Sequence, residues 1–270
     1  MLIIGEKLNS TRKKVKEMIE NRDQKAVQDL ARKQVEAGAE MLDVNASAAE
    51  GNREENMEWL VRTVQEAVDV PLCIDSPHAG EIERGLAVHN WATGKALINS
   101  ITGEKEKIAR LLPTIKKYKC AVIALTMDER GIPDKVSIRL EIAHKLIGIL
   151  TDSGVPLSEI YLDPLVVPIA TSDKNGLITM ETIRGIKDAY PEVKTVIGLS
   201  NISYGLPERK LVNQVFLILT MGCGLDAAII DPTDKRIMAM IKATQILLGK
   251  DNFCCEYLKA YREGKLTLDK

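Results

Sequence analysis

The sequence predicts a (β/α)8 barrel, the TIM-barrel class of α/β fold, on three observations. Short apolar runs alternate with longer amphipathic stretches, and eight such pairs follow one another along the chain. Several of the apolar runs close on Asp or Asn. The chain has 270 residues, which suits one barrel of this class. An open doubly wound sheet is the alternative, but it favours a Gly-rich first turn, and neither G-x-G-x-x-G nor G-x-x-x-x-G-K-[ST] occurs.

Each expected strand is a short apolar run, and each is followed by a stretch with the period of an amphipathic helix. The expected strands are 2–5, 41–45, 72–75, 96–99, 120–126, 160–163, 195–199 and 226–230. The expected helices are 12–21 with 24–37, 54–68, 79–89, 104–119 with a kink at Pro113, 135–153, 175–190, 207–222 with Pro207 in its first turn, and 233–248. Helix-ending glycines at Gly38, Gly154 and Gly224 recur before strands that contain or end near an Asp.

The predicted domain organisation is one barrel over residues 1–250, followed by a terminal helix and tail over 251–270. The helix at 253–262 is expected either to cover the bottom of the barrel or to serve a dimer interface. The longest apolar stretch, 215–230, is interrupted by Gly222, Gly224 and Asp226, so it predicts a helix end, a turn and a strand rather than a membrane span.

Composition restricts the partners and the compartment. Apolar residues make up 45% of the chain, enough for a substantial core. The formal net charge is −1, so no basic field for nucleic acid or anionic lipid is expected. The five cysteines are odd in number and form no C-x-x-C pair, which disfavours disulfide and zinc frameworks and favours a reducing cytoplasm. The N-terminus becomes charged at Glu6, too early for a signal peptide.

Polar side chains gather where the predicted strands end. In a barrel these ends meet on one face, where active sites lie. Asp and Asn at strand ends also cap helices and shape turns, so each one alone is ambiguous, and only their convergence points to a site. The set offers carboxylates and amides without a thiol nucleophile, a histidine base or a metal cluster; it comprises Asn9, Asp43, Asn45, Asp75, Asn99, Met127, Asp128, Asp163, Ser200, Asn201 and Asp231. A carboxylate can accept both hydrogens of an amidine-like N–H pair, and a pterin ring offers such a pair.

Six short stretches resemble one enzyme family in the same order along the chain: LIIGEKLN at 2–9, LDVN at 42–45, CIDS at 73–76, INS at 98–100, LDP at 162–164 and GLSNIS at 198–203. Together they resemble the methyltetrahydrofolate-dependent corrinoid methyltransferases. This family includes the acetogen enzyme that methylates the corrinoid iron-sulfur protein and the folate module of cobalamin-dependent methionine synthase. The resemblance extends over residues 2–248 and implies a pterin-binding TIM barrel, in agreement with the strand count.

The resemblance also implies roles for particular residues. Asp75, Asn99 and Asp163 would bind the pterin ring, and Asn201 would hydrogen-bond the pterin nitrogen that carries the methyl group. Gly198 and Ser200 would line the pocket, and Arg209 matches a family arginine near the folate tail. Tyr204 stands where the acetogen enzyme has a glutamine, which leaves the tail contacts open. Weaker candidates are Asn9, Asp43, Asn45, Tyr204 and His78.

The implied reaction moves a methyl group, in either direction, between 5-methyltetrahydrofolate and the cobalt of a corrinoid. His78, His89 and His144 do not form the Asp-x-His-x-x-Gly pattern that holds a corrinoid, so the corrinoid is expected on a separate protein. A homodimer is expected from the resemblance alone. Two alternatives remain: a dihydropteroate-synthase-like condensing enzyme, which would call for Lys or Arg at the ends of the seventh and eighth strands, and a non-catalytic folate-binding barrel.

Overall fold

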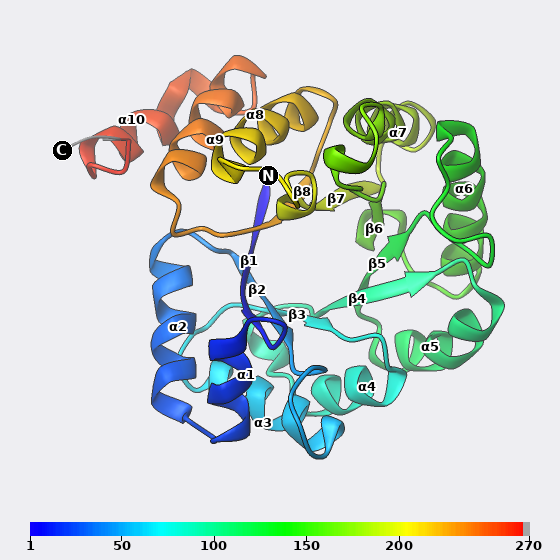
Figure 1. Ribbon diagram of the computed structural model, residues 1–270, viewed down its shortest axis with the longest axis vertical. Coiled ribbons are helices and arrows are strands. Elements are labelled where there is room, and N and C mark those ends of the chain that lie inside the picture. The colour runs from blue at the N-terminus through cyan, green and yellow to red at the C-terminus, as the bar shows by residue number, and fades with distance from the viewer. Residues whose placement is uncertain (267–270) are drawn as a thin grey trace.

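A computed structural model describes residues 1–266 and shows a closed barrel of eight parallel strands in sequence order (Figure 1). The strands are β1 (Leu2–Asn9), β2 (Met41–Asn45), β3 (Leu72–Asp75), β4 (Leu97–Thr102), β5 (Ala121–Leu125), β6 (Ile160–Asp163), β7 (Lys194–Gly198) and β8 (Ala227–Ile230). β1 pairs with both β2 and β8, which closes the barrel and confirms the predicted fold class.

The helices form a ring outside the strands (Figure 1). They are α1 (Lys13–Glu20), α2 (Gln24–Glu36), α3 (Arg53–Gln65), α4 (Ala79–Val88), α5 (Lys105–Tyr118), α6 (Val136–Asp152), α7 (Asn175–Ala189), α8 (Arg209–Gly222), α9 (Lys235–Leu247) and α10 (Cys255–Arg262). The three glycines expected at helix ends have φ values of +108° at Gly38, +89° at Gly154 and +106° at Gly224, the left-handed region that favours glycine.

Several element boundaries differ from the sequence prediction; β4, for example, continues to Thr102 instead of ending at Asn99, and α3 ends at Gln65 instead of Val68. β1 continues to Asn9 instead of ending at Gly5, because its pairing with β2 shifts register between Gly5 and Leu8. At this irregularity the backbone N–H of Lys7 donates to the side chain of Gln34 at 2.9 Å, so it stays paired within the fold. Helix α8 begins at Arg209 rather than 207, because Glu208 before it adopts a left-handed φ of 48°.

Alternation along the strands divides the barrel interior into two layers. The lower layer is apolar and includes Met41, Cys73, Leu97, Tyr161 and Val196. Side chains two positions further along a strand point to the same side, so the next inward positions fall on Asp43, Asp75, Asn99, Asp163 and Gly198. The polar layer therefore lies on top of the apolar one, at the carboxyl ends of the strands.

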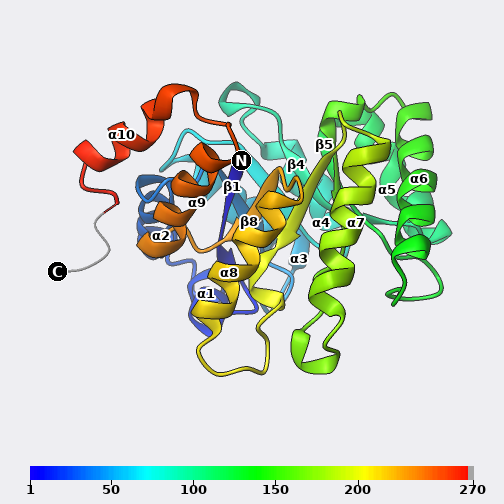
Figure 2. The ribbon, with the colours of Figure 1, turned by 90° about the horizontal axis from the view of Figure 1, so that it is seen from above.

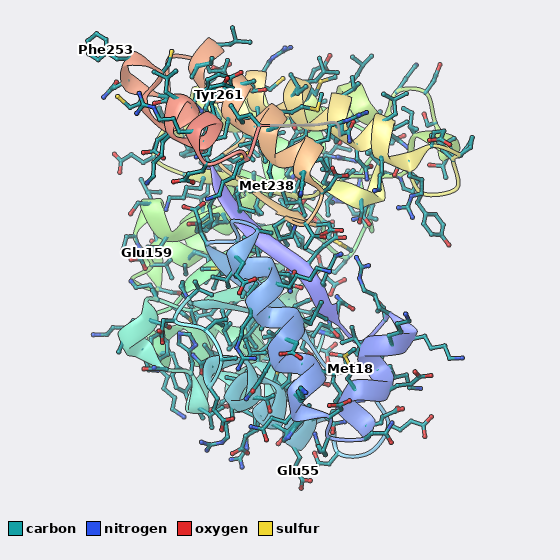
Figure 3. The ribbon with its side chains drawn as sticks, turned by 90° about the vertical axis from the view of Figure 1, so that its left-hand side faces the viewer. Met18, Glu55, Glu159, Met238, Phe253 and Tyr261 are labelled. Atoms are coloured by element: carbon teal, nitrogen blue, oxygen red, sulfur yellow. The ribbon has the colours of Figure 1, made fainter. Side chains whose placement is uncertain are left out.

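The terminal helix α10 packs against α9 at the outer edge of the molecule, not across the bottom of the barrel (Figures 1 and 2). Lys242 on α9 and Glu256 on α10 form an ion pair at 3.9 Å. Phe253 stands clear of the ribbon at this edge (Figure 3). The expected terminal segment 251–270 ends with residues 267–270, which lie outside the described residues. Within 1–266, every helix is too short or too polar to cross a membrane.

Candidate active site

A cavity of about 340 Å³ opens at the carboxyl ends of the strands. Eight of the residues singled out from the sequence line it: Asn9, Asp43, Asp75, Asn99, Asp163, Gly198, Ser200 and Asn201. Glu6, Thr11, Arg12 and Ile229 complete the lining. The convergence of strand ends predicted from the sequence therefore produces one polar pocket.

Two amides and two carboxylates at the floor of the cavity orient one another. Asn45 Nδ2 donates to Asp75 Oδ2 at 2.9 Å, and Asn99 Nδ2 donates to Asp43 Oδ1 at 3.3 Å. Asn45 is held in turn, because its Oδ1 accepts from Ser10 Oγ at 3.2 Å. Asn45 therefore acts from behind Asp75 rather than as part of the cavity wall. Each amide uses one N–H on a carboxylate, and Asp43 is also hydrogen-bonded to the Cys73 thiol, so these contacts fix how the two carboxylates are oriented.

The carboxyl groups of the cavity have raised pKa values. Burial raises the pKa of Asp163 to about 6, against an opposing effect of the Leu165 N–H and the charge of Arg139. Burial also raises the pKa of Asp75 to about 6, despite the hydrogen bond from Asn45. The pKa of Asp43 lies well above its ordinary value, because this group is buried and faces the charge of Asp75. Such perturbed carboxyl groups in a cleft are typical of functional sites.

Asn201 lies above this floor, at the end of a 3-10 turn over Leu199–Asn201 that directly follows β7. A Cβ atom added to Gly198 would lie 3.3 Å from Asn201 Nδ2, so the glycine leaves the amide room over the strand end. Asn201 is exposed, and it lines the same cavity as the buried carboxylates. The amide is therefore accessible to a ligand that the carboxylates hold from below.

Seven of the predicted residues do not line the cavity: Asn45, His78, Met127, Asp128, Tyr204, Arg209 and Asp231. The Arg209 guanidinium donates to the carbonyl of Ser200 at 2.6 Å and to Ser203 Oγ at 3.1 Å, so it holds the loop between β7 and α8. The ring of Tyr204 lies beneath this guanidinium and the residue is 68% exposed. His78 lines a separate groove and contacts Arg53 at 2.9 Å.

Four residues of the cavity wall were not singled out from the sequence: Glu6, Thr11, Arg12 and Ile229. Glu6 reaches the wall because β1 runs past Gly5, and Arg12 forms an ion pair with it at 2.5 Å. Burial raises the pKa of Glu6, with Arg12 opposing. The inward alternation of β1 from Ile4 to Glu6 was the signal that could have found Glu6, but it required the strand to be extended.

A buried carboxylate also supports the floor from behind. Glu81 on α4 is 1% exposed, and its Oε2 accepts from Ser47 Oγ at 2.7 Å and Ser76 Oγ at 3.0 Å. The backbone N–H of Ser47 donates to Asn45 Oδ1 at 3.0 Å. These bonds tie the loops that follow β2 and β3 together, below Asn45 and Asp75. Nothing in the local sequence pattern distinguished Glu81 from a surface helix residue.

The arrangement suits a flat, nitrogen-rich ring. Carboxylates from β2, β3 and β6 can accept N–H groups along one edge of such a ring, and the amides of Asn99 and Asn201 can both donate and accept. The described wall holds no cysteine and no histidine, and its one basic group, Arg12, is paired with Glu6.

Comparison with known proteins agrees with this geometry. Residues 5–231 match the model of the pterin-binding enzyme family. The chain belongs to this family. A methylcorrinoid:tetrahydrofolate methyltransferase of Eubacterium limosum is 40% identical over 268 residues, which cover 98% of both chains. Methionine synthases of Mycobacterium leprae and Mycobacterium tuberculosis are 33% and 32% identical over 243 residues, and the chain spans only 20% of their length.

Solved structures of the pterin-binding fold superimpose on the barrel. Dihydropteroate synthase from Clostridium difficile, solved in the presence of pteroic acid, matches with a TM-score of 0.68 and 16% identity, over 92% of this chain and 96% of that one. The Yersinia pestis dihydropteroate synthase matches with a TM-score of 0.65 and 18% identity, over 92% and 93%. At this identity the likeness concerns the fold alone.

Proposed function

We propose that the protein is a methyltransferase that moves a methyl group between the pterin nitrogen of 5-methyltetrahydrofolate and the cobalt of a corrinoid carried on a separate protein. The observation that carries the proposal is the polar cavity, which Asp75, Asn99, Asp163 and Asn201 line together. The full-length match to a methylcorrinoid:tetrahydrofolate methyltransferase supports it.

The residues present fit a folate pterin. The carboxylates of Asp75 and Asp163 would accept the N–H groups of the pyrimidine edge, and Asn99 would bind the neighbouring polar edge. A cavity of about 340 Å³ accommodates a bicyclic ring, and a small-molecule site of this kind is commonly of that size. The ring would lie on the floor with the methyl-bearing nitrogen toward Asn201 and the open mouth.

Asn201 would serve the reaction by differential hydrogen bonding. A methyl group on a tertiary amine is a poor electrophile, because the nitrogen must accept an electron pair as the carbon–nitrogen bond breaks. A hydrogen bond from Asn201 that strengthens as this bond breaks stabilises the transition state more than the bound substrate. The corrinoid, when the partner protein brings it, supplies the nucleophilic cobalt. The chain positions the ring and keeps the methyl group facing the mouth. Because one transition state serves both directions, the site supports methylation and demethylation of the folate.

The condensing-enzyme alternative is disfavoured by charge. A pyrophosphate leaving group needs free cations near the ends of β7 and β8. In the described structure Arg12 is the basic residue of the wall and is paired with Glu6, and Lys7 pairs with Asp231 at 2.9 Å. The third reading, a folate-binding barrel without catalysis, is distinguished from a methyltransferase by the following experiment.

The test mixes the protein with cob(I)alamin and 5-methyltetrahydrofolate under anaerobic conditions and follows the cobalt absorption spectrum, with a corrinoid protein added in a second arm. Replacement of Asn201 by Ala is expected to lower turnover about a hundredfold while folate affinity changes much less. Asn213→Ala, on the outer helix α8, is the matched control. Folate binding without methyl transfer in either arm would favour the non-catalytic barrel.

We also propose that the protein is a homodimer that forms through an apolar groove between α7 and α8, which lie side by side (Figures 1 and 2). The groove has a volume of about 420 Å³, and Asp173 is the charged residue in its lining. Leu211, Val215 and Leu219 follow one another at four-residue spacing and are 62%, 47% and 49% exposed. A second copy related by a two-fold axis could place these side chains in the groove and cover its own in the same contact.

The dimer is tested by light scattering after size-exclusion chromatography. Val215→Glu is expected to give monomers, since it places a charge in an apolar contact. Phe253→Glu, at an exposed apolar position next to α10 and outside the groove, is the matched control and is expected to leave the dimer intact. Dissociation by Phe253→Glu alone would place the interface at α10 instead. A monomeric native protein would refute the proposal.

The five cysteines, all free, support a location in a reducing compartment such as the cytoplasm.

A further inference from the structure

Arg139 is the largest fully buried side chain of the protein that carries a charge. It lies in the first turn of α6 and is 1% exposed. Its Nε donates to the carbonyl of Pro133 at 2.9 Å, and its terminal nitrogen donates to the carbonyl of Leu165 at 2.8 Å and to that of Pro164. Burying a guanidinium is costly, so a fully buried one calls for a specific reason.

The carbonyls that Arg139 holds belong to the turn directly after β6. In this turn Leu165 has a φ of 65°, the left-handed region in which a residue with a branched side chain is strained. Such strain persists only where surrounding contacts impose it. Here the Leu165 carbonyl receives Arg139 and, at 3.2 Å, the hydroxyl of Thr179 on α7.

The strained turn has one consequence for the cavity. The peptide group that Arg139 holds through the Pro164 carbonyl also contains the Leu165 N–H, which donates to Asp163 Oδ1 at 2.7 Å. One oxygen of Asp163 is therefore fixed by the turn, and the carboxylate is oriented as part of the cavity wall. The Arg139 charge also acts on Asp163 through space and opposes the effect of burial on its pKa.

We propose that Arg139 is a positioning residue for pterin binding: by holding the carbonyls of Pro133, Pro164 and Leu165, its guanidinium fixes the turn that orients the Asp163 carboxylate in the cavity. This inference rests on the proposed function, because it assigns a folate contact to Asp163. A purely structural arginine would stabilise the fold without any effect specific to Asp163.

The charges around Asp163 are few. Arg139 approaches it from α6, and Asp134, on the loop before α6, acts on Arg139 in turn. Across the cavity lie Asp43, Asp75 and Glu6. Arg12 also lines the cavity but is paired with Glu6, whereas the charge of Arg139 lowers the pKa of Asp163, so removal of Arg139 is expected to raise the pKa of that carboxyl further.

The experiment is a double-mutant cycle on tetrahydrofolate binding, measured by calorimetry from about pH 5 to about pH 8, with unfolding by urea measured in parallel. Arg139→Met is expected to weaken binding about tenfold near neutral pH and to shift the midpoint of the pH profile upward, since an ionised Asp163 is the better acceptor. Arg139→Lys keeps the charge but cannot reach all three carbonyls, so binding is expected to weaken with an unchanged midpoint. Arg130→Met, whose guanidinium pairs with Asp128 and Glu141 at the surface, is the matched control.

In an Asp163→Asn background the effect of Arg139→Met on binding is expected to disappear. The proposal would be overturned if Arg139→Met weakened tetrahydrofolate binding equally in the native and Asp163→Asn backgrounds. It would also be overturned if Arg139→Lys bound with native affinity, and this comparison remains decisive if Arg139→Met does not fold. If even the native protein fails to bind tetrahydrofolate, the proposed function fails instead. The link between Arg139 and Asp163 is then tested by urea unfolding alone. Arg139→Met is expected to move the part of the stability–pH profile that depends on Asp163 to higher pH. Absence of this shift would overturn the proposed link.

Discussion

Replacement of Asp163 by Asn is expected to make the protein more stable and a weaker folate binder. The pKa of Asp163 rises on folding from its ordinary 3.8 to about 6, because the carboxyl is buried beside the cavity. The folded state therefore holds the proton more tightly than the unfolded chain does. Stability from this group is fully present below pH 3.8 and is lost as the pH rises toward about 6. Asparagine has the same shape, stays neutral at every pH and can still accept the Leu165 N–H.

The magnitude follows from the two pKa values. Above both of them, ionisation of Asp163 costs about 3 kcal/mol of unfolding free energy. At about pH 5 roughly half of this cost is present. Asp163→Asn is thus expected to exceed the native protein in stability by about 1.5 kcal/mol at about pH 5 and about 3 kcal/mol at about pH 7.5. Loss of a charged acceptor should at the same time weaken folate binding about tenfold to a hundredfold.

The assay is urea unfolding at both pH values, combined with calorimetric folate titration at the higher one. Asp188→Asn, the same substitution on the exposed side of α7, serves as the control and should change neither quantity. A stability difference that does not grow between the two pH values would show that Asp163 is not held out of water as the structure indicates. Unchanged folate affinity would remove Asp163 from the binding site.

Two further predictions probe the upper and lower ends of the barrel. Gly198→Ala would bring a Cβ within 3.3 Å of Asn201 Nδ2, and a displacement of the amide by a few tenths of an ångström should lower turnover roughly tenfold in the methyl-transfer assay, with the melting temperature almost unchanged. A normal turnover would mean that the position of Asn201 is not critical. Asp226→Ala removes the acceptor of Lys187 Nζ at 3.0 Å and of the Thr195 N–H at 2.9 Å, so it should cost about 2 kcal/mol in urea unfolding without changing folate affinity. A change in folate affinity would contradict the assignment of this end of the barrel to stability alone.

Local sequence patterns predicted the elements well because their physical causes are local. Apolar runs of four or five residues, glycines at Gly38, Gly154 and Gly224, and helical periodicity between them act within a few residues. Pairing is not local, and this explains the error at β1. Whether the strand ends at Gly5 or continues to Asn9 depends on its register with β2 and on the side chain of Gln34, which lies in α2.

The candidate site likewise has features that depend on local sequence and features that depend on distant contacts. The sequence by itself determined which residue types stand at the strand ends, since Asp75, Asn99 and Asp163 each close or interrupt an apolar run, and alternation then directs them inward. Only the tertiary structure decided which of them share a cavity, that Arg209 and His78 turn away from it, and that buried Glu81 and Arg139 support it from α4 and α6. The physical reason is that a strand end fixes the direction of a side chain locally, whereas burial, charge and the hydrogen bonds behind a side chain depend on distant segments that come together only when the barrel closes.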